Sequence, residues 1–223
     1  MSLWKVPLRR PFAFLALGAL AAAVYVAGLA IDAYPLRLAS KAVPVLCLAA
    51  WVRAGSRDRF AYFVTGGLVL SALGDLLLEL APGFFLHGLA AFLLANLAYL
   101  AAFVSEVQQP ALLRLVPFAA WVVAAFGALR PGLGSLAAPV LAYMTAIVAM
   151  MWRAAARIGS SPRGEASAWA ATSGAVLFAA SDTLIAFDRF HAALPGVRIP
   201  IILLYWAGQL GIAVSARPRG GVW

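Results

Sequence analysis

Eight apolar segments, separated by short polar connections, constrain this chain more than any other feature. Most are close to the 20 or so residues that a helix needs to cross the hydrocarbon core of a membrane. Charged residues make up 11% of the chain and hydrophobic residues 65%, whereas an average soluble domain is about 25% charged. We therefore predict an all-α, polytopic membrane helix bundle with about eight transmembrane helices. The segments cover residues 11–31, 38–52, 60–80, 84–104, 113–129, 134–152, 167–187 and 199–216.

The connections between the segments are short and contain proline or glycine, which interrupt helices. None of them is long enough to hold a second domain, so we expect a single integral membrane domain over residues 1–223. The second segment is shorter than the others and contains Pro44. We expect this helix to be tilted, kinked or only partly spanning.

Basic residues predict how the segments are oriented, because cytoplasmic loops carry an excess of Lys and Arg. With the amino terminus inside, five basic residues fall on the outer side: Arg37, Lys41, Arg130, Arg189 and Arg198. The other twelve of the 17 fall on the cytoplasmic side, so both termini are predicted to be cytoplasmic. These flanking charges explain the net charge of +9 without a nucleic-acid partner. The abundance of Ala, Arg and Gly favours a bacterial cytoplasmic membrane.

Two aspartates, Asp75 and Asp182, lie inside strongly apolar segments. A charged side chain at the centre of a membrane helix costs about 2.5–3.5 kcal/mol on insertion scales. Each aspartate is the sixteenth residue of its segment, and the predicted topology runs both segments outward from the cytoplasm. We therefore expect the two carboxyl groups at similar depth in the outer half of the membrane, where they could face one cavity.

Further polar residues share helical faces with one another, as the spacing of three or four residues indicates. Ser71, Asp75 and Glu79 form one such stripe, Asn96 and Tyr99 a second, and Tyr205 and Gln209 a third. The candidate pocket residues are therefore Lys41, Ser71, Asn96, Tyr99, Ser181, Tyr205 and Gln209. An alternative for several of them is simple hydrogen bonding between helices. Glu79 lies near a helix end, where solvation at the membrane interface would explain it, and Lys41 could extend to a lipid headgroup.

The chemistry open to these residues is acid–base catalysis. Lys41 is the one cation expected near the aspartates and cannot neutralise both, so at least one of them should be neutral or in contact with water. Two histidines and one cysteine make a zinc site improbable, and no nucleophile elbow or phosphate-binding glycine loop is present. We predict no metal and no cofactor.

At these residues the chain resembles the YhhN-like family of membrane proteins, which includes the lysoplasmalogenases. The similarity rests on residues 41–44 (KAVP), 71–75 (SALGD), 84–103, 174–190 and 205–216, in that order along the chain. One position departs from the family pattern, because Asn96 stands where a histidine is expected. If that histidine transfers protons, activity here is altered; if it only forms hydrogen bonds, asparagine can replace it.

The resemblance implies an enzyme that hydrolyses the vinyl ether bond of lysoplasmalogens, with Asp75 and Asp182 as the catalytic pair. Its partner would be a lysophospholipid substrate within the membrane, and Lys41 could hold the phosphate or tune a carboxylate. The residues themselves leave two other classes open: a proton-coupled transporter that uses the aspartates as a relay, and a lipid-binding membrane protein without turnover. The roles of the two aspartates and the oligomeric state stay open.

Overall fold

The structure is a computed structural model, and it describes residues 10–217. This part of the chain is helical, with short connections between the helices. The α-helices are α1 (Arg10–Ala30), α2 (Tyr34–Ser40), α3 (Val43–Gly55), α4 (Arg59–Leu80), α5 (Phe85–Glu106), α6 (Val116–Leu133), α7 (Ala137–Ala156), α8 (Glu165–Phe190) and α9 (Arg198–Ser215). Three short 3-10 helices, η1 (Pro82–Phe84), η2 (Leu112–Leu115) and η3 (Gly134–Leu136), lie in the connections.

Seven continuous helical stretches among the described residues are long and apolar enough to cross a membrane. One of them, Leu112–Ala156, has 45 residues and contains both α6 and α7, which η3 separates. Helices suit this environment because each backbone N–H and C=O is satisfied within its own segment. The predicted all-α polytopic membrane bundle is confirmed, while the number of crossings and the side of the termini stay predictions.

The second apolar segment is longer than expected and is broken in two. It runs over the 22 residues Tyr34–Gly55, rather than 38–52, as α2 and α3 with a break at Lys41 and Ala42. Pro44 lies in the first turn of α3, where its missing N–H costs no helical hydrogen bond. The segment is therefore interrupted just before Pro44, and the interruption places Lys41 at the junction of two helices.

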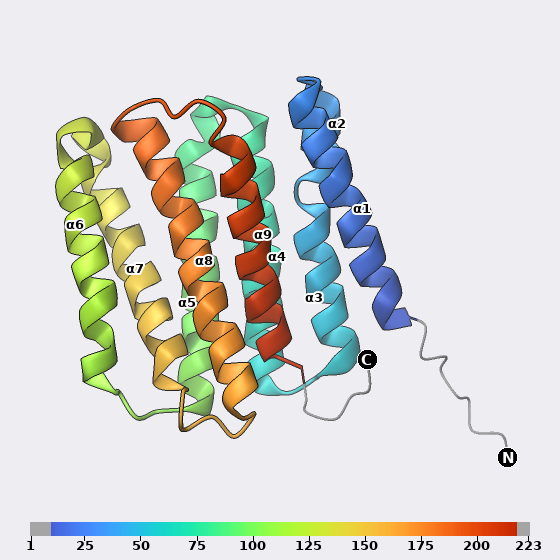
Figure 1. The fold of residues 1–223 in the computed structure, drawn as a ribbon, viewed down its shortest axis with the longest axis vertical. Helices are drawn as coiled ribbons and strands as arrows, with labels where there is room; N and C mark the ends of the chain where they lie inside the picture. The colour runs from blue at the N-terminus through green and yellow to red at the C-terminus, as the bar shows by residue number, and fades with distance from the viewer. Residues whose placement is uncertain (1–9, 218–223) are drawn as a thin grey trace, which may run out of the picture.

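The helices form a bundle in which α4, α5, α8 and α9 are central (Figure 1). Helices α1–α3 flank them on one side, and α6 and α7 on the other (Figure 1). The most extensive contacts join α4 to α5 and α8 to α9. Both ends of the described chain lie at the same end of the bundle, which we call the terminal end; α4 and α8 run from there to the opposite end (Figure 1).

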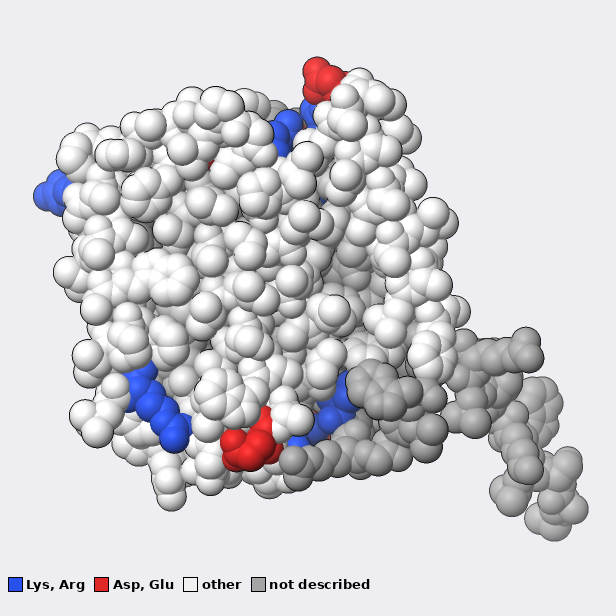
Figure 2. Space-filling view, in the orientation of Figure 1, with Lys and Arg blue, Asp and Glu red and all other residues white. Residues whose placement is uncertain are grey.

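Charged side chains on the visible face lie near the two ends of the bundle, and the band between them is uncharged (Figure 2). Exposed apolar side chains such as Leu20, Tyr62 and Val123 are more than 60% exposed, as expected for a surface that faces lipid tails. This distribution fits a bundle whose helix axes cross the membrane.

Candidate active site

Asp75 lies on α4 in the interior of the bundle, with 3% of its surface exposed. Its Oδ2 atom accepts a hydrogen bond of 2.6 Å from the Tyr205 hydroxyl on α9. The adjacent Gly74 leaves space for the Phe92 ring, because a Cβ on Gly74 would lie 2.6 Å from that ring. Within residues 10–217 no Lys or Arg forms an ion pair with Asp75, so a tyrosine rather than a cation is its direct partner.

Asp182 lies on α8 and is partly buried. Its Oδ2 atom accepts a hydrogen bond from the Tyr143 hydroxyl on α7, and the described chain again offers it no ion pair. Sequence reasoning did not single out Tyr143. The available signal was a tyrosine in the middle of the apolar segment 134–152, away from the membrane interfaces where tyrosine is usually found.

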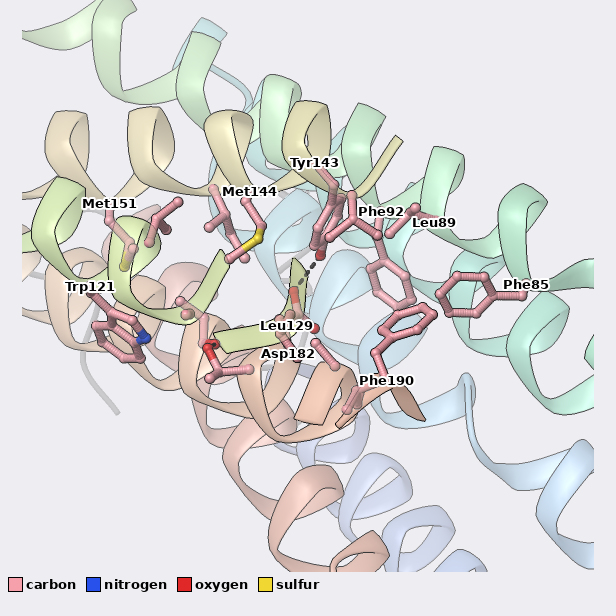
Figure 3. Close-up of a pocket in the computed structure, with 18 of the residues that line it drawn as sticks. Phe85, Leu89, Phe92, Trp121, Leu129, Tyr143, Met144, Met151, Asp182 and Phe190 are labelled. Carbon is pink, nitrogen blue, oxygen red and sulfur yellow. Dashed lines mark hydrogen bonds between the residues drawn. The ribbon is translucent and has the colours of Figure 1, made fainter. Parts of the chain in front are cut away.

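Asp182 also lines a cavity between α5, α6, α7 and α8, to which α4 contributes Leu78 (Figure 3). The cavity holds about 790 Å³ of empty space, including its mouth. Aromatic, aliphatic and methionine side chains make up most of its wall, among them Phe85, Phe92, Trp121, Leu129, Met144, Met151 and Phe190 (Figure 3). An elongated apolar ligand would therefore meet an ionisable group at Asp182. Asp75 is not among the residues that line this cavity.

Aromatic rings connect the surroundings of the two aspartates. Phe92 lines the cavity, and its ring packs edge-on against Tyr205 at a centroid distance of 5.9 Å. Phe178 contacts both rings, at 6.0 Å from Phe92 and 5.8 Å from Tyr205. The partner of Asp75 and the wall of the Asp182 cavity thus belong to one packed aromatic cluster.

The predicted polar residues Ser71, Tyr99 and Gln209 form one buried network across three helices. The Tyr99 hydroxyl donates to Gln209 Oε1 at 2.6 Å and lies 3.3 Å from Ser71 Oγ. Gly67 leaves space for the Tyr99 ring, because a Cβ there would approach it to 2.2 Å. The spacing that put Tyr205 and Gln209 on one face of α9 therefore points both residues into the bundle.

Asn96 is fully buried on α5. Neither its Nδ2 nor its Oδ1 atom has a hydrogen-bond partner among the described residues, and the same holds for Gln209 Nε2 and Trp206 Nε1. Buried polar groups are nearly always satisfied by protein or by water. Each of these atoms is therefore a position where water or a polar part of a ligand can bind.

Ser181 and Lys41 have partners other than the aspartates. The Ser181 hydroxyl donates to the Ile201 carbonyl at 2.8 Å and so connects α8 to α9. Lys41 Nζ donates to Glu79 Oε2 at 3.1 Å. Ser181 is therefore placed as a contact between helices, while Lys41 belongs to a separate charged group around Glu79.

The expectation that Glu79 is solvated at the membrane interface was wrong. Its side chain is 4% exposed, and it pairs with Arg37 at 3.1 Å, Lys41 at 3.1 Å and Arg198 at 3.4 Å. Lys41 is likewise not the one cation in this region, because α2 begins at Tyr34 and carries Arg37 inward. Neither Arg37 nor Arg198 lay inside a predicted segment, so this arrangement could not be predicted from the apolar segments.

Comparisons with known proteins agree with one family over most of the chain. The YhhN family matches residues 36–216. The chain is 38% identical over 180 residues to lysoplasmalogenase TMEM86B of Homo sapiens, covering 79% of this chain and 73% of that protein. It is 34% identical over 189 residues to the lysoplasmalogenase of Mycobacterium bovis, covering 81% of this chain and 70% of that protein. No solved structure gives a significant match. The chain belongs to the YhhN family, to which it is similar along nearly the whole of its helical bundle.

Proposed function

We propose that this protein hydrolyses the vinyl ether bond of lysoplasmalogens, releasing a fatty aldehyde and a glycerophospho-ethanolamine or glycerophospho-choline. The relatives named above are lysoplasmalogenases. The observation that carries the proposal is the pair Asp75, which is buried, and Asp182, which is partly buried. Each accepts a hydrogen bond from a tyrosine hydroxyl, and among residues 10–217 neither forms an ion pair with a cation.

The reaction needs an acid and a base within one site. A carboxylic acid protonates the β carbon of the vinyl ether, which becomes an oxocarbenium ion. Water adds to this ion and gives up a proton to a carboxylate. The product of this step is a hemiacetal. The hemiacetal then collapses: its hydroxyl gives up a proton, the carbon–oxygen bond to glycerol breaks, the glycerol oxygen takes up a proton, and the aldehyde leaves. One water is consumed, and the two carboxyl groups finish with the proton they held at the start.

Asp75 and Asp182 supply these roles. A medium of low dielectric constant favours the neutral form of a carboxyl group, and two carboxyl groups near one another do not both ionise readily. We assign one aspartate as the proton donor and the other as the group that stabilises the cation and accepts the proton from water. Tyr205 and Tyr143 hold the two carboxyl groups in place through their hydroxyls.

The remaining candidate residues fit the other parts of the substrate. The apolar cavity that Asp182 lines suits the long alkenyl chain. The unpaired atoms of Asn96 and Gln209 suit the water that the reaction consumes. Ser71 and Tyr99 keep Gln209 oriented through their hydrogen bonds.

The direct test is release of fatty aldehyde from a lysoplasmalogen by the purified protein in detergent micelles. The matched control substrate is the 1-alkyl lysolipid, which has a saturated ether and cannot form the oxocarbenium ion by protonation. We expect aldehyde from the first substrate and none from the second. A transporter would release no aldehyde in micelles, and that result would contradict the proposal.

The position of the transferred proton tests the mechanism. In heavy water we expect the aldehyde, trapped as it forms, to carry one deuterium on the carbon next to the carbonyl. An aldehyde without deuterium at that carbon would show that cleavage does not begin with proton transfer to the β carbon.

A further inference from the structure

The charged group around Glu79 is positively charged overall. We call Tyr25, Arg37, Lys41, Glu79 and Arg198 the Glu79 cluster. Tyr25 donates to Glu79 Oε2 at 3.4 Å, and the three cations lie within 3.1–3.4 Å of the same carboxylate. The one other carboxylate paired to these cations in the described chain is Asp32, which contacts Arg37 and is 92% exposed. Three positive charges therefore face two negative ones.

The donors of the cluster exceed what Glu79 can accept. A carboxylate has about four acceptor positions, whereas each arginine of the cluster alone carries about five N–H donors and the lysine about three. Arg198 contributes a single contact of 3.4 Å through Nη2, and its side chain is 54% exposed. It is also the first residue of α9, where the helix dipole favours an anion. Arg198 thus presents a cation outward from a cluster that has positive charge to spare.

The position of the cluster relative to Asp75 matches the dimensions of a lysophospholipid. Glu79 lies four residues beyond Asp75 on α4, which is about 6 Å along the helix axis. The Arg198 Nη2 atom lies 3.4 Å from the carboxylate of Glu79. In a lysoplasmalogen about seven bonds, each roughly 1.5 Å long, connect the phosphorus to the β carbon of the vinyl ether. A phosphate at Arg198 would allow the vinyl ether to reach Asp75.

The cluster also lies at one end of the bundle, where we expect lipid headgroups if the helices cross the membrane. Leu80 is the last residue of α4, and Arg198 is the first of α9. The cluster is therefore at the end of the bundle opposite the terminal end (Figure 1). A lysolipid in the membrane leaflet at that end would present its phosphate to Arg198 while its chain stays in the hydrocarbon.

We propose that the Glu79 cluster binds the phosphodiester of the lysophospholipid substrate, with Arg198 and Lys41 as the residues that contact the phosphate oxygens. Arg37 and Glu79 hold Lys41 and Arg198 in position through the ion pairs. The substrate then enters from the end of the bundle opposite the termini and places its glycerol toward Asp75. This inference rests on the proposed function, because it assigns the headgroup subsite of the same reaction.

The test compares two vinyl ether substrates that differ only in the headgroup: a lysoplasmenyl-ethanolamine and the corresponding 1-alkenylglycerol, which has no phosphate. For Arg198→Gln we expect kcat/KM on the phospholipid to fall by about tenfold, as for loss of one charge-assisted hydrogen bond, mainly through KM. Activity on the alkenylglycerol should stay near that of the wild type. Arg130→Gln is the control, because Arg130 is an exposed arginine at the same end of the bundle, on α6, and should affect neither substrate.

Inhibition distinguishes a lipid headgroup site from a site for free phosphate. We expect glycerophosphoethanolamine to inhibit the wild type more strongly than Arg198→Gln, and inorganic phosphate to inhibit neither. Equal losses on both substrates would mean that Arg198 acts on the fold, and inhibition by inorganic phosphate alone would assign the cluster to a free anion; either result overturns the inference. Failure of the wild type to cleave either substrate would instead contradict the proposed function.

Discussion

Tyr205 and Tyr143 are the residues that most directly orient the two aspartates. Each donates its hydroxyl hydrogen to a carboxylate oxygen on a neighbouring helix. A hydrogen bond to a charged group contributes about 1.5–3 kcal/mol. The loss of either hydroxyl should therefore change catalysis more than packing, because phenylalanine keeps the ring contacts.

For Tyr205→Phe and Tyr143→Phe we expect kcat for aldehyde release to fall by roughly 10–100-fold. Tyr62→Phe is the control, since Tyr62 lies on α4 with 66% of its surface exposed and should leave kcat unchanged. Wild-type kcat in both of the first two variants would show that neither hydrogen bond serves the reaction.

The burial of Asn96 costs stability, and a role in the reaction would explain why the residue is kept there. A buried polar group without a partner costs about 1–3 kcal/mol, and both polar atoms of Asn96 are unpaired within the described chain. For Asn96→Leu, which has a similar volume, we expect a higher midpoint of thermal unfolding and a lower rate of aldehyde release. A lower midpoint would show that the amide is satisfied and structural. Asn96→His, which restores the residue expected for the family, should retain activity.

Some of these residues could be predicted from spacing alone and others could not. The period of the helix placed Ser71 with Asp75, Asn96 with Tyr99, and Tyr205 with Gln209 on shared helix faces, because residues three or four apart share a face. The sequence could not identify which helices are neighbours. Lys41 was therefore assigned to the aspartates, whereas it pairs with Glu79, 38 residues away.

At the scale of elements, α8 and α9 pack with their backbones in close contact at three glycines. A Cβ on Gly208 would lie 2.7 Å from the Phe178 nitrogen, and one on Gly174 would lie 2.7 Å from the Gly208 oxygen. Such small residues let membrane helices approach closely. This contact fixes Tyr205 and Gln209 relative to α8, and so sets the spacing of the site.

For Gly208→Ala we expect a loss of about 1–3 kcal/mol in the free energy of unfolding, as for overpacking. Gly66→Ala is the matched control, because no atom lies within 4 Å of a Cβ at that position of α4. Alanine there should be neutral or stabilise by up to about 1 kcal/mol. Thermal unfolding in detergent measures both, and equal midpoints for the two variants would contradict the close contact.

The start of α4 depends on pH through Asp58, which lies outside the apolar stretch. Burial raises the pKa of the Asp58 carboxyl. Hydrogen bonds from the Ala61 backbone N–H, Arg163 and Ser56 lower this pKa by more than burial raises it, so it lies below its ordinary value. Stability from this group is thus present above the unfolded value of about 3.9 and is lost as the pH falls through the folded value.

For Asp58→Asn we expect a smaller drop in the unfolding midpoint than in the wild type when the pH is lowered from about 5 to about 3. The reason is that asparagine has no proton to take up. Midpoints measured across this range check the sign. A steeper drop in the variant would mean that the carboxylate opposes folding.

At the scale of the whole molecule, the apolar segments predict the overall fold better than they predict the details of the site. Segment lengths predicted the α-helical membrane bundle, and the described helices match the segments to within a few residues, except that α2 begins at Tyr34 and not at residue 38. The basic residues predict the orientation in the membrane, and this orientation places the Glu79 cluster on the outer side. The cavity could not be predicted, because its wall combines side chains from five helices.

The measurement that tests the central claim most directly is the rate of aldehyde release by Asp75→Asn and Asp182→Asn, each beside the wild type. Asparagine keeps the size of the side chain and removes the acid. We expect kcat to fall by about 10²–10⁴-fold in each variant, with thermal unfolding showing that both are folded. Full activity in either variant would contradict the assignment of the two aspartates as the catalytic pair.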